Sequence, residues 1–347
     1  IISVICFTVT FLFTFLIIRT QTIHEAFTLD KINSIQKIHQ KPTIRVGGIA
    51  IFISLLITSF IIKDDTVTKL IISSIPVFFA GLIEDITKKV SPLLRLIFSL
   101  ISAILVVMLL NHTIEQVDIE VIDKLLSIKF VSVFLTILAI STFTNGMNII
   151  DGLNGLALGT SFLIALTIFI ISFNHFYLPI NYISIAIIGT TFGIWFYNFP
   201  NGKIFIGDGG AYLLGFILSY LVIMWPEKNE FVSPFASLLL ILYPLYELVR
   251  SFIRRAFTKG KSISQPDNYH FHSLVFDFVN ISKKIKINKN AFSTIIVLFL
   301  PIYCSVWVYL YFDNQGMLKV GCVLFVIFYE IIFLFIRYLK KKSYSFL

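Results

Sequence analysis

The stretch Thr144-Asn-Gly-Met-Asn-Ile-Ile-Asp-Gly-Leu-Asn-Gly-Leu-Ala-Leu-Gly159 joins two long apolar runs and gathers polar side chains between them. Four residues with oxygen-bearing side chains follow one another at intervals of three: Asn145, Asn148, Asp151 and Asn154. This spacing places successive side chains near one face of a helix or helical turn. A polar junction that only caps two membrane helices needs one or two such residues. Because polar groups beside hydrocarbon are costly without partners, we predict that the stretch belongs to a functional site.

The composition indicates an integral membrane protein. Of the 347 residues, 57% are hydrophobic and 14% are charged, and the mean hydropathy is +0.90. These values lie far from those of soluble globular proteins. Apolar runs of about 18 residues recur along the whole chain, which is the pattern of membrane-spanning helices. We therefore expect an all-α polytopic membrane protein in which residues 1–347 form a single integral membrane domain.

The apolar runs predict eleven transmembrane helices, with boundaries defined to within several residues. The first run, Ile1–Ile18, has no small-residue cleavage site, so we expect a retained membrane helix and not a signal peptide. The predicted spans are residues 1–18, 46–62, 67–83, 93–110, 130–147, 156–173, 179–197, 209–225, 232–249, 291–312 and 318–336.

The loops between these spans alternate between two sides of the membrane, and the two sides differ strongly in charge. One side carries 22 of the 28 Lys and Arg residues, in the segments 19–45, 84–95, 148–155, 198–208, 250–290 and the tail after 336. Positive residues accumulate on the cytoplasmic side of membrane proteins. We therefore expect the N-terminus outside, the C-terminus in the cytoplasm, and the polar motifs around a cleft on the cytoplasmic face.

Two adjacent carboxylates, Glu84 and Asp85, lie at the end of the third predicted span. Adjacent carboxylates repel each other and need a cation, a shared proton or solvent nearby. Lys88 and Lys89 offer one explanation, because they are neighbours of the pair along a helix. The preceding Gly81 and the apolar approach favour another, in which the pair faces a cleft and takes part in catalysis.

A further acidic motif, Gly207-Asp-Gly-Gly210, lies where the eighth predicted span begins. We expect an exposed turn here, and a carboxylate beside flexible amides and the positive end of a helix suits a hard cation or a phosphate. The alternative is an N-cap, a position that Asp fills well but that needs no flanking glycines. On the same loop, we expect Phe205 to stack on a flat base and not to face lipid.

Basic and imidazole side chains on the same side are typical of phosphate recognition. Lys41 precedes a proline, which keeps Lys41 out of a helix and fixes where its ammonium points. His270 and His272 are separated by one residue in the longest predicted cytoplasmic loop, which also contains Arg255. Two histidines alone make no zinc site, whereas imidazole and guanidinium groups donate well to phosphate. The alternative is a basic segment that binds anionic lipid, which explains the lysines in 283–289 better than it explains the histidines.

Five motifs, in their order along the chain, resemble those of the polyprenyl-phosphate N-acetylhexosamine-1-phosphate transferases, enzymes of the glycosyltransferase family 4 type. Members of this family move a sugar 1-phosphate from a UDP-sugar to undecaprenyl phosphate and release UMP. The resemblance extends along nearly the whole chain in five ordered motifs: Lys41–Gly48, Gly81–Arg95, Asn145–Gly155, Asn198–Gly210 and Pro266–His272.

The resemblance implies a transferase of the bacterial cytoplasmic membrane that depends on Mg²⁺, with Mn²⁺ as an alternative ion. The partners that it implies are a UDP-N-acetylhexosamine, undecaprenyl phosphate and membrane lipid. Nucleic acid is not among them, and a homodimer is one option for the assembly.

The resemblance also assigns roles to single positions. Asp208, with help from Asn148, would hold Mg²⁺ on the donor diphosphate, and the Glu84–Asp85 pair would lie near the acceptor phosphate. We place Asp151 with this pair among the catalytic groups, and Phe205 would stack on uracil. The other residues expected to bind substrate are Lys41, Asn145, Gly152, Leu153, Asn154, Arg255, His270 and His272.

The sequence departs from the family pattern at three positions. Glu84 replaces the usual first Asp of the acidic pair, and Asn154 stands where many members have Asp. Ser273 replaces a third histidine that is typical of the branch using UDP-muramoyl-pentapeptide. We therefore favour UDP-N-acetylglucosamine or a related donor, for capsule, O-antigen or wall-polymer synthesis, over that branch.

A transporter or flippase for lipid-linked sugars is an alternative from a different class. Such proteins tend to have internal repeats and charges near the middle of the membrane. The sequence has no evident internal repeat, and Glu330 is the one carboxylate that we expect deep within a span.

Charge repulsion between the two substrates shapes the expected mechanism. A phosphomonoester is mostly a dianion at neutral pH, and the donor diphosphate is also negative. Repulsion is then the main barrier, which makes cations essential. We expect direct in-line attack of the lipid phosphate on the sugar-bearing phosphorus, with Asp85 as a modest base or an orienting group. A covalent phospho-aspartate route is the alternative.

Overall fold

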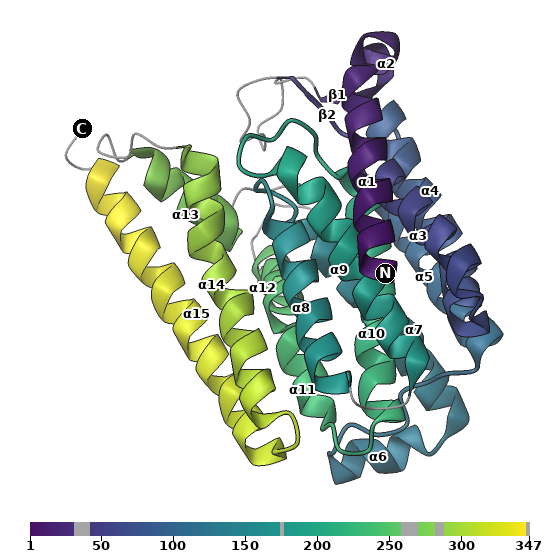
Figure 1. The fold of residues 1–347 in the computed structure, drawn as a ribbon. Coiled ribbons are helices and arrows are strands. Elements are labelled where there is room, and N and C mark those ends of the chain that lie inside the picture. The colour runs from purple at the N-terminus through teal and green to yellow at the C-terminus, as the bar shows by residue number, and fades with distance from the viewer. Residues whose placement is uncertain (31–41, 174–176, 258–269, 282–287, 345–347) are drawn as a thin grey trace.

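The computed structural model describes residues 1–30, 42–173, 177–257, 270–281 and 288–344. These residues form a bundle of helices with one very short pair of strands (Figure 1). In chain order the elements are α1 (Ile2–Arg19), α2 (Gln21–Thr28), β1 (Leu29–Asp30), β2 (Thr43–Ile44), α3 (Gly48–Ile62), α4 (Asp65–Thr87), α5 (Pro92–Leu110), α6 (Glu120–Leu126), α7 (Lys129–Ile150), α8 (Leu156–Ser172), α9 (Leu178–Asn198), α10 (Gly207–Lys228), α11 (Pro234–Leu240), α12 (Leu242–Phe257), α13 (Phe271–Ile281), α14 (Lys289–Tyr311) and α15 (Gln315–Tyr344).

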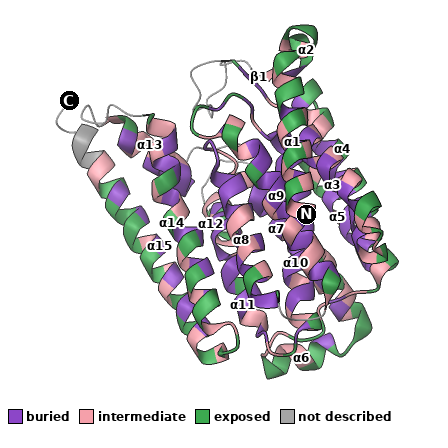
Figure 2. Ribbon diagram, in the orientation of Figure 1, coloured by how far each residue is buried: buried purple, intermediate pink, exposed green. Residues whose placement is uncertain are grey.

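Helix α10 is the central helix of the bundle and packs against α3, α4, α5, α7, α8, α9 and α11. Nearly every residue from Gly207 to Trp225 is buried (Figure 2). The sequence explains this burial, because α10 has no charged side chain between Asp208 and Glu227. A helix that is apolar on every face can be surrounded on every side. Its N-terminal turn consequently lies in the interior of one end of the bundle.

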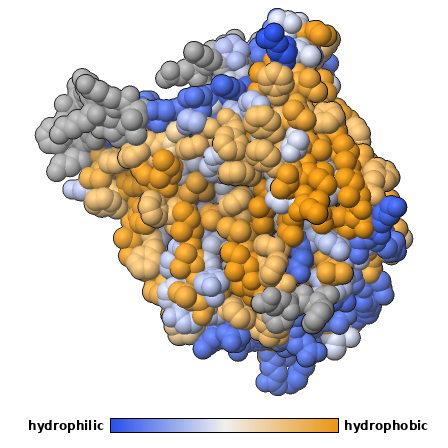
Figure 3. Space-filling model, in the orientation of Figure 1, coloured by the Kyte–Doolittle hydropathy of each residue, from blue (hydrophilic) through white to orange (hydrophobic). Residues whose placement is uncertain are grey.

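The outer helices expose apolar side chains over much of their length. On α1, for example, Leu12, Phe15 and Leu16 are all exposed (Figure 2). The apolar surface forms a broad band, and hydrophilic residues gather toward the two ends of the molecule (Figure 3). An apolar belt of this extent is compatible with lipid and not with water. The chain is therefore an all-α polytopic membrane protein, as predicted.

All eleven predicted spans are helical, but they are not equally long. Among the described residues, eight helices are long and apolar enough to cross a membrane. Helices α3 and α8, predicted as full spans, have only 15 and 17 residues. At a rise of about 1.5 Å per residue they are shorter than a hydrocarbon core of about 30 Å. The eleven predicted spans are thus apolar helical segments within the described residues, and eleven is not an established number of complete spans.

The predicted span at residues 232–249 is broken. Helices α11 and α12 meet at an angle of 68°. Pro244 explains the break, because it has no N–H to donate to the carbonyl of Leu240, the last residue of α11. Helix α12 then continues to Phe257, well beyond the predicted end.

Short elements that the hydropathy pattern did not reveal lie at the two ends of the bundle. Helices α2 and α13 and the two strands lie at one end, at the top of Figure 1, and α6 lies at the other. Strands β1 and β2 pair antiparallel, and Ile44 of β2 also bridges to Ile204 in the loop before α10. This bridge brings the segment that leads into α3 beside the segment that leads into α10.

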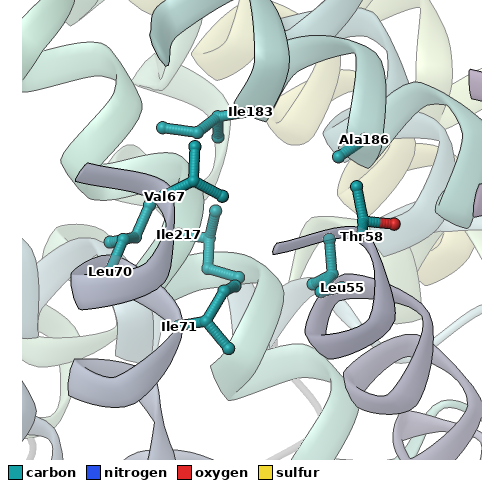
Figure 4. Close-up of a pocket in the computed structure, with 8 residues that line it drawn as sticks. All are labelled: Leu55, Thr58, Val67, Leu70, Ile71, Ile183, Ala186 and Ile217. Carbon is teal, nitrogen blue, oxygen red and sulfur yellow. The ribbon is translucent and has the colours of Figure 1, made fainter. Parts of the chain in front are cut away.

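A small apolar cavity of about 10 Å³ lies between α3, α4, α9 and α10 (Figure 4). It is near the start of α4, the end opposite to the acidic pair. Its size is about that of one water molecule, so it is a packing feature and cannot hold a sugar nucleotide. The lining residues are Leu55, Thr58, Val67, Leu70, Ile71, Ile183, Ala186 and Ile217.

Candidate active site

Glycines bring two helices into contact with the first turn of α10. A Cβ atom on Gly48 of α3 would overlap the backbone of Gly210, and one on Gly81 of α4 would overlap the backbone of Gly209. Gly207 has a φ of +71°, a conformation that favours glycine. The glycines around Asp208 have this packing role, so they do not by themselves indicate a ligand.

Asp85 anchors the N-terminus of α10 from the neighbouring helix α4. Its Oδ1 accepts the backbone N–H of Asp208 at 2.8 Å, and its Oδ2 accepts that of Gly209 at 2.9 Å. Arg45 Nε lies 3.1 Å from Oδ1. The side chain is 1% exposed. With both oxygens engaged and no open surface, Asp85 is arranged to hold the site together, and the geometry favours an orienting role over that of a base.

Asp208 is the centre of a cluster of charges. Its Oδ1 accepts Arg45 Nη2 at 2.5 Å and Asn148 Nδ2 at 3.2 Å, and its Oδ2 accepts a hydrogen bond from Arg95 Nη1. The residue is only 5% exposed, so the prediction of an exposed turn was wrong. The N-cap alternative is also wrong, because Asp85, and not Asp208, accepts the free N–H groups of α10. We name Arg45, Asp85, Arg95, Asn148 and Asp208 the α10 cluster.

Glu84 lies apart from its neighbour Asp85. It is half-buried, and its Oε2 accepts the backbone N–H of Val90 at 2.7 Å. This bond closes the turn between α4 and α5, whose positive-φ residue is Lys88. The acidic pair therefore divides into one carboxylate that anchors α10 and one that shapes a turn.

The stretch from Asn145 to Asn154 does not form a single polar stripe. Helix α7 ends at Ile150, so only its last turns present the polar side chains on one helix. Asn148 reaches Asp208. Asn145 bonds to the Ser141 carbonyl at 2.8 Å within its own helix and to Ser99 Oγ of α5 at 3.3 Å.

Asp151 directly follows α7 and is half-buried beside the α10 cluster. Burial raises the pKa of its carboxyl well above the usual range; the Arg45 charge opposes this rise and the Asp208 charge adds to it. A carboxyl group with a raised pKa next to cations is a common feature of catalytic sites.

Asn154 turns away from the cluster and joins three segments. Its N–H donates to Asn290 Oδ1 at 2.9 Å, its side-chain amide donates to the Pro200 carbonyl at 3.2 Å, and its carbonyl accepts Thr294 Oγ1 at 2.9 Å. Its neighbour Leu153 is buried in the core. The structure thus places both residues in packing positions beside the site.

The loop before α10 is held at both ends. Asn198 Oδ1 accepts the N–H of Gly155 at 2.5 Å, and its amide donates to the Ile204 carbonyl at 2.7 Å. Phe205 donates its N–H to the Ile44 carbonyl at 2.8 Å and accepts from Gly47 at 2.9 Å. The half-buried ring of Phe205 therefore extends from a fixed backbone, three residues before Asp208.

The two histidines lie together at the start of α13, and their rings are stacked. The ring centroids are 5.5 Å apart, and the angle between the ring planes is 2°. A Cβ on Gly152 would overlap the His272 ring, so the turn after α7 fits against this histidine. Burial lowers the pKa of His272 to about 4, and the charge of His270 acts in the same direction. His272 is consequently neutral at physiological pH, with a buried Nδ1 that has no hydrogen-bond partner among the described residues.

The remaining predicted residues are less informative. Lys41 lies outside the described residues. Arg255 lies near the end of α12, half-buried, on the same end of the bundle as α13. Neither residue is placed against the α10 cluster by a described contact.

Three residues at this end were not among the predicted site residues. In the sequence, Arg45 and Arg95 appeared only as parts of charged loops and of two motifs. A single arginine within the apolar helix α5 is a signal that could have identified it. Glu247 of α12 is 2% exposed and pairs with His270, so Glu330 is not the one deep carboxylate.

No group of three or more His, Cys, Asp or Glu side chains with metal-binding geometry occurs in the described part of the chain. Magnesium, however, is usually held by one or two carboxylates together with substrate phosphates and water. Asp208 has a carboxylate and Asn148 an amide oxygen, which are donors of the kind that Mg²⁺ prefers, and the two side chains lie in contact through the amide nitrogen of Asn148. This small donor set is compatible with a metal shared with a phosphate substrate.

Comparison with known proteins identifies the family. The family model described as glycosyl transferase family 4 matches residues 67–226, which include α4 to α10. The chain is 31% identical over 244 residues to the undecaprenyl-phosphate alpha-N-acetylglucosaminyl 1-phosphate transferase of Thermotoga maritima, covering 70% of this chain and 71% of the relative. It is 29% identical over 247 residues to the probable undecaprenyl-phosphate N-acetylglucosaminyl 1-phosphate transferase of Bacillus subtilis, covering 70% and 68%.

A relative from another branch is also similar. The phospho-N-acetylmuramoyl-pentapeptide-transferase of Halalkalibacterium halodurans is 26% identical over 291 residues, covering 78% of this chain and 87% of the relative. All three relatives are bacterial. The α10 cluster lies between helices inside the matched region, apart from Arg45, which precedes it. The chain is a bacterial multi-pass membrane protein and belongs to glycosyl transferase family 4.

Proposed function

We propose that this protein transfers an N-acetylhexosamine 1-phosphate, with N-acetylglucosamine as the favoured sugar, from a UDP-sugar to undecaprenyl phosphate and releases UMP. The family and the names of the relatives from Thermotoga maritima and Bacillus subtilis support this reaction. The product would be the first lipid-linked intermediate of a cell-surface polysaccharide such as a wall polymer, capsule or O-antigen.

The α10 cluster is the single observation that carries the proposal. Two arginines, two buried aspartates and an amide converge where α3, α4, α5 and α7 meet the first turn of α10. A transporter or a structural scaffold has no need for such a concentration of charge at one end of a bundle. A reaction between two phosphate-bearing substrates needs both cations for the phosphates and acids for a metal.

In this proposal Asp208 and Asn148 would hold Mg²⁺, with Mn²⁺ as an alternative. The ion would offset negative charge on the donor diphosphate as the bond to UMP breaks. Asp85 keeps the N-terminus of α10, and with it Asp208, in place. The positive end of the α10 dipole adds a favourable field for phosphate at the same point.

The arginines and Asp151 complete the reacting region. Arg45 and Arg95 both contact Asp208, so phosphates that approach this carboxylate meet two guanidinium groups. Guanidinium groups form strong paired hydrogen bonds with phosphate oxygens. Asp151 would take a proton from any acceptor phosphate that arrives as the monoanion. We favour direct attack of this phosphate on the sugar-bearing phosphorus, because Asp85 has no free oxygen for a covalent intermediate.

The donor would extend from this region along the loop before α10 and the start of α13. Phe205 would stack on uracil, and His270 and His272 would meet the donor phosphates or sugar beside Gly152. The excess of Lys and Arg in the loops at this end favours a cytoplasmic location for it. A reporter fused after Lys342 should then read cytoplasmic, and one within residues 116–127 should read external.

The decisive experiment is release of UMP by the purified protein. UDP-N-acetylglucosamine, undecaprenyl phosphate and Mg²⁺ should together give UMP, and omission of the lipid phosphate should abolish the release. UDP-N-acetylmuramoyl-pentapeptide as donor tests the other branch of the family. No UMP from either donor would refute the proposed function and favour the transporter alternative.

A further inference from the structure

Glu247 on α12 is a buried carboxylate with three hydrogen-bond partners, and it lies outside the α10 cluster. Its Oε1 accepts the backbone N–H of Phe271 at 3.0 Å and the hydroxyl of Tyr329 at 2.7 Å. Its Oε2 lies 3.2 Å from His270 Nδ1. Since an unpartnered carboxylate is very costly to bury, these bonds account for its retention in the interior.

The partners of Glu247 come from two other helices. Phe271 is the first residue of α13, so its N–H is one of those that a helix leaves unpaired, and Glu247 caps α13 from outside. Tyr329 belongs to α15 and is fully buried, with its ring 4.8 Å from that of Tyr246 and 5.0 Å from that of Phe271. The fixed hydroxyl of Tyr329 in turn fixes the orientation of the Glu247 carboxylate.

This arrangement determines how the His270 ring is presented. An ionised carboxylate only accepts hydrogen bonds, so Nδ1 of His270 carries the proton that faces Glu247. The opposite nitrogen, Nε2, then points away from Glu247. His272 also fixes the orientation of the His270 ring, because the two rings stack. The His272 ring itself packs against Gly152, in the turn that carries Asp151.

We propose that Glu247, held by Tyr329, is a positioning residue that fixes the tautomer and orientation of His270 toward the sugar of the donor. The proposal rests on the proposed function, in which His270 meets the donor. Glu247 does not itself touch substrate, because it is 2% exposed and its oxygens are occupied by the protein. Its effect passes through one hydrogen bond to His270. With the proton on Nδ1, Nε2 is the hydrogen-bond acceptor of the ring, so it suits a hydroxyl or amide N–H of the donor sugar.

The chain offers a matched control between the same two helices. Glu330 of α15 accepts the hydroxyl of Tyr246 at 2.9 Å and Arg250 Nε at 2.7 Å, both from α12. It resembles Glu247 in linking α12 and α15 through a tyrosine hydroxyl, but its second partner is Arg250, and it contacts no histidine among the described residues. Glu330→Gln therefore measures the cost of weakening the α12–α15 contact alone.

The first test is structural and does not depend on turnover. Protein labelled with ¹⁵N-histidine, with the His270 signals assigned by His270→Asn, should show His270 in the Nδ1–H form. Glu247→Gln presents an amide N–H to the ring and should shift His270 to the Nε2–H form, whereas Glu330→Gln should leave it unchanged. Finding the Nε2–H form in the wild-type protein would overturn the proposal.

The second test is a double-mutant cycle on UMP release. Glu247→Gln should raise the donor KM by about 10-fold, the range of a lost hydrogen bond, with a smaller change in kcat. In the His270→Ala background the same change should add less than about 2-fold, because its effect passes through His270. Tyr329→Phe, a milder change that keeps the ring, should act in the same direction with a smaller rise in KM.

The two tests also separate this proposal from the proposed function. Full additivity of Glu247→Gln and His270→Ala, or an equal loss in Glu330→Gln, would reduce Glu247 to a packing role and contradict the proposal. A wild-type protein that releases no UMP with any donor would refute the proposed function, and the ¹⁵N spectra would still decide whether Glu247 sets the tautomer of His270.

Discussion

The first turns of α10 and α13 are built in the same way but from different partners. Each helix begins beside residues of the candidate site, and each is capped by a buried carboxylate from another helix: Asp85 for α10 and Glu247 for α13. In both cases the cap lies far from the capped residue in the sequence. A carboxylate in this position satisfies free N–H groups and also orients a functional side chain.

The two carboxylates differ in the side chains with which they pair. Asp85 faces Arg45, whose charge is permanent, and glycines bring α3 and α4 against the α10 backbone. Glu247 faces the imidazole of His270 and a tyrosine hydroxyl. The α10 end is therefore a fixed site suited to a metal and phosphates. The α13 end is an adjustable one, suited to recognising a donor.

Of the changes that compare the two helix ends, removing the charge of Asp85 should lower activity the most. Asp85→Asn removes one of the two buried carboxylates that pair with Arg45 and weakens the anchor of α10, so kcat should fall by about 100-fold and the apparent Tm should drop. Glu84→Gln, the adjacent change, affects only the turn at Val90 and should cost less than about 5-fold. UMP release and thermal unfolding of both variants measure the contrast. Similar small losses in both would remove Asp85 from the anchoring role.

Phe205 tests whether the loop before α10 carries the donor base. Phe205→Leu keeps an apolar side chain but loses stacking, which is worth about 1–3 kcal/mol per base. The donor KM should rise by about 10-fold, with little change in turnover at saturating donor. The steady-state dependence on UDP-sugar concentration gives both constants. An unchanged donor KM would remove Phe205 from the uracil site.

The adjustable end should respond to pH through His272. Its pKa is lowered to about 4, so between about pH 6.5 and pH 4 the unfolded chain binds a proton that the folded chain does not. Stability should decrease as the pH falls through this window, by a few kcal/mol at most. The His272→Asn variant should lose this part of the decrease. Apparent Tm measured from pH 7 to pH 4.5 compares the two, and parallel curves would contradict a buried neutral His272.

Much of the fold followed from the sequence, because lipid imposes length and apolarity on every span. The break before α12 was missed although Pro244 signals it, because a 19-residue hydropathy window averages over one proline. The bounds of α3 and α8 were predicted to within two residues, but both helices were taken as complete spans although they have only 15 and 17 residues.

The site was predicted in part. Asp208 and Asn148, which are 60 residues apart, were both identified and do lie in contact. Arg45, Arg95 and Glu247 were missed as site residues because their roles come from partners distant in the sequence. Arg45 and Asp208 are 163 residues apart, Arg95 and Asp208 are 113, and Glu247 and Tyr329 are 82. The exposed position expected for Asp208 was wrong because glycines, which read as flexibility in the sequence, serve here for close helix contact.

Asp208→Asn tests the central claim, that the α10 cluster is a metal-dependent phosphate-transfer site. The helix should remain capped, because Asp85 provides the cap. Asp65→Asn is a suitable control, since Asp65 pairs with Lys69 at 2.6 Å at the opposite end of α4.

The measurement is UMP release and apparent Tm across a Mg²⁺ titration for the wild-type protein and both variants. Asp208→Asn should remain folded, lose about 100-fold or more in kcat, and lose the rise in Tm that Mg²⁺ gives the wild-type protein. Asp65→Asn should match the wild type in both. Near-wild-type UMP release by Asp208→Asn at ordinary Mg²⁺, with an unchanged response of Tm to the ion, would contradict the account.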